Sequence, residues 1–167
     1  MLVTKEADYA LRCVLEVAQH GRVSAARVAE LQGISPAFLG KIVQSLAHAG
    51  ILSTRRGVGG GVALAVPLES LTMLRVIEAV EGPLCINDCV ADPPRCAQID
   101  DCPIYPYLQH AQGALRDIFA VTMAQLASGD IGLAGLGELP RPLTSANGNG
   151  APSSAPAADA LTAGGED

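Results

Sequence analysis

Apolar side chains recur at helical spacing from the start of the chain. In residues 4–19, Tyr9, Cys13 and Val17 follow one another at intervals of four. Because residues three and four apart share one face of an α-helix, this spacing predicts an amphipathic helix with Cys13 in the core. Gly21 is expected to end it, since glycine adopts the backbone conformations found just past helix ends.

A short helix is predicted next. Ser24 is a suitable N-cap, because its hydroxyl can accept a hydrogen bond from a free N–H of the first turn. The pattern that follows predicts a helix through Leu31 that buries Val28 and Leu31. The sequence "QGIS" then predicts a tight turn, with Gly33 free to take a positive φ.

The third predicted helix begins after Ser35 and continues to about Ala49. Ser35 is its expected N-cap, and Pro36 occupies the first helical position, where a missing N–H is harmless. Gly50 is expected to end it. Its expected buried positions recur in threes and fours: Leu39, Ile42, Val43 and Leu46.

Two short extended segments follow. "ILSTRR" and "GVALAV" flank "GVGGG", which predicts a β-hairpin with a glycine-rich tip. Thr72 is then the expected N-cap of a helix over residues 73–80, closed by "EGP".

The stretch "CVADPPRCAQIDDC", residues 89–102, is too polar and too rich in proline for a helix or strand, and we expect a loop. Pro103 then begins a predicted long helix to about Ala127. From about Gly129 onward the composition is of low complexity, which predicts a disordered tail. Apolar positions of the long helix form a seam suited to a coiled-coil-like partner helix: Leu108, Ala111, Leu115, Ile118 or Phe119, Thr122 and Leu126.

These elements predict a mainly α protein with an aliphatic core, since the chain has no Trp and only five Phe and Tyr residues. Helix, short helix, turn, helix and hairpin is the order of a winged helix-turn-helix. The expected organisation is a DNA-binding domain over 1–83, a cysteine loop over 84–102, a dimerisation helix over 103–128 and a tail over 129–167.

The net charge of -6 looks wrong for a nucleic-acid binder, but it is unevenly distributed. Residues 1–83 hold eight Lys and Arg against seven Asp and Glu, and the acidic excess lies in residues 84–167. The overall charge therefore does not exclude DNA as a partner of the first half. A nearly neutral module binds weakly alone, so a two-fold dimer reading a pseudo-palindromic operator is expected.

The third predicted helix, the second of the helix-turn-helix, is narrow enough to enter a major groove of DNA. The arginines beside the glycine tip of the hairpin suit a minor groove. Lys41 and Gln44 can reach phosphates or base edges. Phe38 could contact thymine methyl groups or fix the helix to the core. The alternative for the hairpin is an ordinary glycine-rich turn with solvated arginines. The candidate DNA contacts are Ser24, Ser35, Pro36, Ala37, Phe38, Lys41, Gln44, Arg55, Arg56, Gly59, Gly60 and Gly61.

Three thiols make the loop a candidate metal site. Cys89, Cys96 and Cys102 could hold an iron–sulfur cluster or zinc, or form a thiol–disulfide switch. Their spacing lacks the close C-x2-C pairs of zinc ribbons. Cys85 could be a spare ligand, a resolving thiol or a small apolar residue, and we favour the last. Three cysteines leave a four-iron cluster one ligand short, and Asp8 is one candidate, although it also fits an ordinary exposed helix position.

Other functional classes find little support. No apolar stretch reaches 18 residues, and "MLVTKEADYALR" carries charges where a signal peptide is apolar, so a cytoplasmic protein with no membrane contact is expected. No nucleophile–base pair or carboxylate pair suggests an enzyme.

The segments "LVTKEADYALR", "ISPAFL" through "AGIL" to "RGVGGG", "LTMLRVIEAVEGP" and the cysteine loop resemble the iron–sulfur-dependent winged-helix transcription regulators (IscR/NsrR-like) over roughly residues 1–128. The resemblance implies a homodimeric regulator with a 4Fe-4S or 2Fe-2S cluster on the three loop cysteines. NsrR-like members take their fourth ligand from an aspartate of the other protomer, at the place of Asp8. IscR-like members use a histidine where this chain has Tyr105.

This chain departs from that pattern at several positions. Six residues separate Cys89 from Cys96, where five are usual, and Gly40 stands where many members carry glutamate. We therefore expect a DNA-binding regulator controlled by a cluster that senses nitric oxide, redox state or iron. The alternatives are a cluster-free regulator with a thiol–disulfide or zinc switch, and a redox or electron-transfer iron–sulfur protein.

Overall fold

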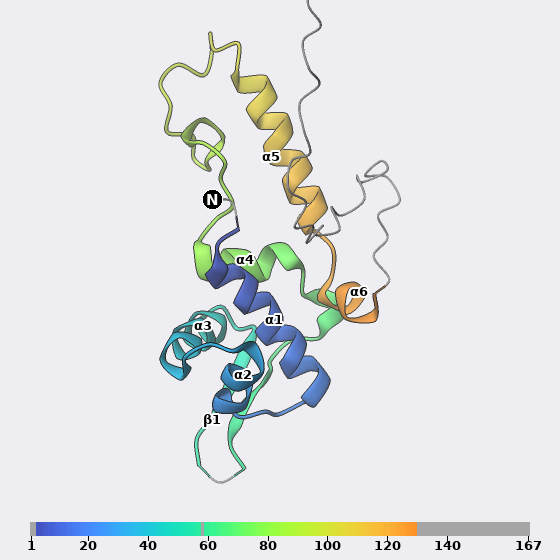
Figure 1. The fold of residues 1–167 in the computed structure, drawn as a ribbon. Helices are drawn as coiled ribbons and strands as arrows, with labels where there is room; N and C mark the ends of the chain where they lie inside the picture. Colours follow the sequence, from blue (N-terminus) through green and yellow to red (C-terminus); the bar gives the residue numbers. More distant parts are fainter. Residues whose placement is uncertain (1–2, 58, 130–167) are drawn as a thin grey trace, which may run out of the picture. The chain divides into compact units, whose positions relative to one another are not determined.

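The structure, a computed structural model, describes residues 3–57 and 59–129 (Figure 1). It is mainly helical with one two-stranded antiparallel sheet, which confirms the predicted fold class. Its elements are α1 (Lys5–His20), α2 (Ala25–Gln32), α3 (Pro36–His48), β1 (Leu52–Arg55), β2 (Gly61–Leu64), η1 (Leu68–Ser70), α4 (Met73–Glu81), η2 (Asp88–Val90), α5 (Tyr105–Phe119) and α6 (Met123–Ser128).

The predicted N-caps of α2, α3 and α4 are confirmed, and Thr4 caps α1 in the same way. The hydroxyls of Thr4, Ser24, Ser35 and Thr72 each accept a hydrogen bond from a main-chain N–H of the following turn. Such caps satisfy donors that have no partner inside the helix, so they fix the register of α1 to α4.

The core of this domain is aliphatic, as the composition predicts. It combines Cys13 of α1 and the predicted stripe of α3 with residues of the hairpin and α4. Leu31 is an exception, because it is 40% exposed. The buried stripe of α2 runs through Val28 and Ala29, which places Leu31 at its edge.

The hairpin pairs β1 with β2 in the register Leu52 with Leu64 and Arg55 with Gly61. A further segment joins it, because Val23 and Val62 form an antiparallel bridge. The connection between α1 and α2 therefore lies against β2. It holds this β1–β2 hairpin, the wing of the domain, to the helices.

The prediction of a single helix from Pro103 to about Ala127 is wrong, because two helices occupy this region. α5 ends at Phe119, and α6 begins at Met123 after a new N-cap at Thr122. Thr122 and Gln125 form a reciprocal capping box, which favours a fresh helix start over continuation. The chain turns back toward the DNA-binding domain here, because Met123 is fully buried in the core of that domain.

Main-chain hydrogen bonds hold the segment between α5 and α6 against the DNA-binding domain. The N–H of Met73 donates to the carbonyl of Val121 at 2.9 Å, and the N–H of Met123 donates to that of Leu71 at 2.7 Å. The end of α5 is thereby joined to the start of α4.

Among residues 3–57 and 59–129, no helix combines the length and hydropathy needed to cross a bilayer. The predicted tail over 129–167 lies outside the described residues, apart from Gly129.

Candidate nucleic-acid interface and cysteine loop

The predicted recognition helix is presented as a helix-turn-helix requires. Gly33 closes α2 in the left-handed conformation, with φ of 64°, and directs the chain into α3. Most of the candidate contacts on α3 and at its cap are exposed, namely Ser35, Pro36, Ala37, Lys41 and Gln44. These side chains are free to meet another molecule.

Phe38 differs from its neighbours on α3. It is half-buried and packs against the core, and its ring meets that of Tyr9 edge-on at 5.8 Å between centroids. Such aromatic pairs stabilise a fold beyond their buried area. The geometry favours the interpretation in which Phe38 fixes α3 to α1.

The wing tip depends on glycine. A Cβ on Gly60 would lie 2.3 Å from the carbonyl oxygen of Arg55, and one on Gly61 would lie 2.6 Å from that of Val23. Gly59 has φ of 73°, which other residues rarely adopt. Gly59, Gly60 and Gly61 are therefore required by the tight turn itself, and they add no side chains to it.

Positive charge gathers on this part of the chain. Residues 17–68 contain five Lys and Arg and one acidic residue, Glu30, which pairs with Arg27 at 2.8 Å. Lys41, Arg55 and Arg56 are exposed and make no ion pair within the described residues. A surface of this kind suits a polyanion.

Sequence reasoning missed Arg22 as a candidate contact. It is exposed and immediately precedes Val23, which is bridged to the wing. Only that bridge places a residue from the end of α1 beside β2, so no local signal in the sequence could have found it. Ser24, the other neighbour of Val23, lies beside Gly61.

The loop cysteines are all free thiols in different environments. Cys89 lies buried in η2, which packs against α5, whereas Cys96 and Cys102 are partly exposed. Cys85 is exposed, which leaves its role as a small apolar residue, a spare ligand or a resolving thiol a prediction. Its thiol points back to the carbonyl of Asn87, at 3.0 Å, because the chain turns before η2.

The three candidate ligands are not gathered. No group of three or more His, Cys, Asp or Glu side chains in the described part of the chain is placed to hold a metal ion. The donor set nevertheless fits an iron–sulfur cluster in its chemistry, since it offers three cysteine thiols, none of them in a disulfide, on one loop of turns and a single 3-10 turn. Assembly of a cluster would therefore require the loop to rearrange.

Asp8 is not brought to the cysteines either. It is partly exposed on α1, and its carboxylate pairs with Arg12 at 3.0 Å. Cys13, on the same helix, is fully buried, and burial raises the pKa of its thiol to about 12. Cys13 is therefore a core residue, as predicted.

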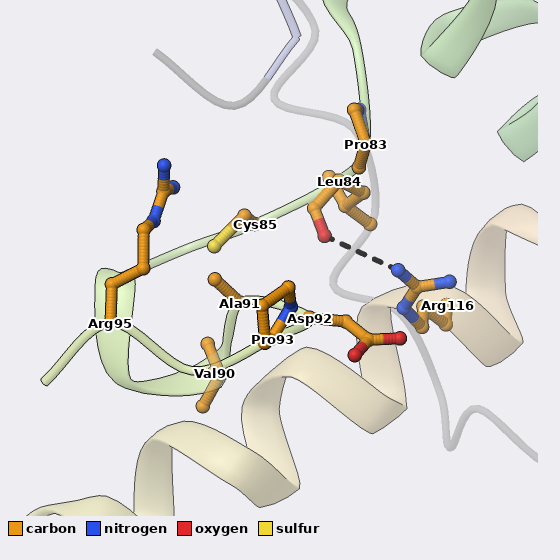
Figure 2. Close-up of a pocket in the computed structure, with 9 residues that line it drawn as sticks. All are labelled: Pro83, Leu84, Cys85, Val90, Ala91, Asp92, Pro93, Arg95 and Arg116. Atoms are coloured by element: carbon orange, nitrogen blue, oxygen red, sulfur yellow. Dashed lines mark hydrogen bonds between the residues drawn. The ribbon is translucent and has the colours of Figure 1, made fainter.

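The start of the cysteine loop is anchored at Leu84 by side chains from two helices. Glu78 of α4 accepts a hydrogen bond from the N–H of Leu84 at 3.0 Å, and Gln112 and Arg116 of α5 donate to its carbonyl. Leu84, Cys85 and Arg116 also line a cavity of about 260 Å³ with residues 90–93 and Arg95 (Figure 2). The loop thus begins at a fixed point between α4 and α5.

A family model described as an iron-dependent transcriptional regulator, Rrf2, matches residues 3–129. The chain belongs to the Rrf2 family. It is therefore a DNA-binding transcription regulator and not an enzyme.

Relatives of this Rrf2 chain agree with the assignment. Protein aau3 of Rhizobium meliloti is 32% identical over 153 residues, which are 87% of this chain and 99% of that protein. The regulator IscR of Aliivibrio salmonicida is 34% identical over 92 residues, about half of each chain at 53% and 55%. The oxidized form of Staphylococcus aureus CymR superposes with a TM-score of 0.60 at 25% identity, covering 76% of this chain and 96% of that one.

Proposed function

We propose that this Rrf2 regulator binds a pseudo-palindromic operator as a homodimer, and that an iron–sulfur cluster on its cysteine loop controls the binding. The observation that carries the proposal is the position of the loop. It holds three free thiols and joins the DNA-binding domain to α5, so a change in the loop acts on both.

DNA is read by α3 and the wing. Lys41 and Gln44 face the major groove, the hydroxyls of Ser24 and Ser35 donate to phosphates, and Arg55 and Arg56 enter the minor groove beside Gly59–Gly61. The support is the exposed, unpaired positive charge of this surface. Pro36 and Ala37 bring the start of α3 close to the backbone, because their side chains are short.

The dimer forms through α5. Gln112 is the only buried side chain of this helix, while Ile104 at its N-cap and Tyr107 and Ile118 within it are 61%, 78% and 39% exposed. Large apolar side chains in this number on one helix mark a surface that a partner covers. A second copy of α5 provides the matching surface and gives the two-fold symmetry that a pseudo-palindrome needs.

Cys89, Cys96 and Cys102 hold the cluster, either 4Fe-4S or 2Fe-2S, and Asp8 of the other protomer supplies the fourth ligand. A bound cluster supplies a centre that nitric oxide, oxygen or iron loss can alter. The protein's part is to release Cys89 from its buried position and Asp8 from Arg12, so loading changes the packing of both η2 and α1. The signal shifts the population between two DNA affinities.

The test is anaerobic purification followed by visible spectroscopy, iron and sulfide analysis, and operator titration before and after nitric oxide. We expect a brown protein whose operator Kd changes when the cluster is lost. Replacing Cys89, Cys96 and Cys102 together by alanine should give colourless protein that no longer responds. Equal affinity of the wild type and this variant, with and without iron, would refute cluster control.

A thiol–disulfide switch without a metal is the second candidate. It is favoured by the exposure of Cys85, four residues before Cys89 in the sequence, and by the likeness to the oxidized form of CymR. It predicts colourless protein in which mild oxidation forms a disulfide within residues 85–102 and changes the operator Kd. The same anaerobic spectrum separates the two candidates, and bound zinc would appear in the metal analysis.

A further inference from the structure

Gln112 stands out among the described residues as the one polar side chain in the buried set, at 7% exposure. A buried amide is costly unless both ends of it are hydrogen-bonded. Here the oxygen of Gln112 accepts from the N–H of Ile86 at 3.1 Å, and its nitrogen donates to the carbonyl of Leu84. Both partners are main-chain groups of the segment that leads into the cysteine loop.

This contact closes the loop on α5. The far end of the loop runs directly into the same helix, since the N–H of Tyr105 donates to the carbonyl of Cys102 at 3.3 Å. Tyr105 and Gln112 are seven residues apart on one helix, a fixed separation of roughly 10 Å at 1.5 Å rise per residue. Any rearrangement that gathers thiols between these two points therefore pulls on Leu84 rather than stretching α5.

The pull reaches α4 through Glu78. Its carboxylate accepts from the N–H of Leu84 at 3.0 Å and lies 3.6 Å from Arg116 of α5. One turn before Glu78 on α4, Arg75 donates to the carbonyl of Ala49, the residue that caps the end of α3, at 3.5 Å. Leu84 is thus joined by direct contacts to α4, and α4 to the recognition helix.

We propose that Gln112 is a positioning residue that couples the state of the cysteine loop to the orientation of α3. The inference rests on the proposed function, because it needs a loop whose state controls operator binding. Both hydrogen bonds of Gln112 go to main-chain groups and not to a thiol. It holds Leu84 and Ile86, so that a change within residues 85–102 is transmitted to α4 instead of being absorbed by a loose connection.

The experiment compares operator Kd values of cluster-loaded and cluster-free protein for the wild type, Gln112→Leu and Gln112→Glu, using a duplex selected from a random pool with the wild type. For the wild type we expect the operator Kd values of the two forms to differ at least about five-fold, within the usual range of allosteric coupling. This ratio, taken as the weaker over the tighter Kd, is compared between variants. Gln112→Leu, which loses both hydrogen bonds, should bring the ratio to within about two-fold of one. Gln112→Glu keeps the acceptor for Ile86 and should give an intermediate ratio.

Controls separate coupling from stability. Gln109→Leu alters an exposed glutamine on the same helix and should keep the wild-type ratio. Iron content should match the wild type, and amide exchange at Ile86 should be faster in Gln112→Leu. A wild-type ratio in Gln112→Leu, or equal weakening of both states, overturns the inference. If Gln112→Leu fails to fold or load, Gln112→Glu decides in the same way, and a wild-type ratio of one refutes cluster control instead.

Discussion

Val23 and Val62 exchange a pair of main-chain hydrogen bonds, at 3.0 Å and 2.8 Å, that hold the wing against the end of α1. The pair leaves no room beside it, since a Cβ on Gly61 would lie 2.6 Å from the carbonyl oxygen of Val23. The position of the wing arginines relative to α3 therefore depends on a glycine that carries no functional group.

Gly61→Ala should break this contact. Its φ of 143° is unfavourable for alanine, and the backbone on both sides has to move. We expect the free energy of unfolding to fall by about 1–3 kcal/mol, measured by denaturant titration without DNA. Gly40→Ala is the matched control, because its Cβ meets nothing within 4 Å and lies in a helix. It should stabilise by about 0.5–1 kcal/mol. Equal stability of the two variants would contradict this account of the wing.

Arg55→Ala combined with Arg56→Ala should weaken operator binding through lost phosphate contacts. If each arginine neutralises one phosphate, the slope of log K against log salt falls by about 0.9 per residue. The readout is operator affinity at several salt concentrations. Lys5→Ala removes one charge at the far end of α1 from the wing and should leave the slope unchanged. An unaltered slope in the double variant would remove the wing from the interface.

Phe38→Ala should mainly affect stability. Loss of the edge-on contact with Tyr9 and of apolar burial predicts a decrease of about 1–3 kcal/mol in the free energy of unfolding, less than for a fully buried ring. Phe38→Leu keeps most of the apolar volume and should recover part of it. If both variants unfold like the wild type but bind the operator more weakly, Phe38 contacts DNA instead.

The buried thiol of Cys13 should make the free energy of unfolding fall at alkaline pH. Burial raises the pKa of its thiol from 9.0 to about 12, with a smaller contribution from Glu16. The unfolded chain therefore loses this proton from about pH 9, while the native state keeps it. The contribution of the protonated Cys13 thiol to the free energy of unfolding is complete below pH 9. It is lost as the pH rises towards 12, at up to about 1.4 kcal/mol per pH unit.

The measurement is the difference in unfolding free energy between the wild type and Cys13→Ala as a function of pH, which cancels the other titrating groups. Cys13→Ala should be less stable at pH 7 because it leaves a cavity, and the gap should narrow above pH 9. A constant gap would mean that the thiol is accessible to solvent.

Local chemistry carried most of the fold prediction. Ser24, Ser35 and Thr72 were recognisable as caps because hydroxyls satisfy free N–H groups wherever a helix begins. The apolar stripe of α3 was correct for the same reason, since helical spacing alone decides which residues share a face. The wing followed from its glycines.

Tertiary contacts decided what the sequence left open. The predicted seam after Pro103 runs through Thr122 to Leu126, but the capping box of Thr122 and the burial of Met123 turn the chain back there. Gln112 is polar, and nothing in its local sequence marks it as buried. Its burial depends on the main chain of Leu84, 28 residues earlier, which no local pattern reports. The same limit applies to the loop cysteines, whose spacing does not say whether they meet.

The hydrogen bonds of Val121 and Met123 to Met73 and Leu71 attach the end of α5 to the DNA-binding domain. Gln112 attaches the middle of α5 to Leu84 at the start of the cysteine loop, which Glu78 of α4 holds in turn. A helix fixed at two points cannot swivel on a linker. In a dimer paired through α5, the distance and twist between the two copies of α3 are then set by the rigid frame. One extra base pair between half-sites rotates the second by about 35°, which this frame cannot follow. If the proposed dimer binds through this frame, the operator spacing that it accepts would depend on Met123, a residue buried in the core.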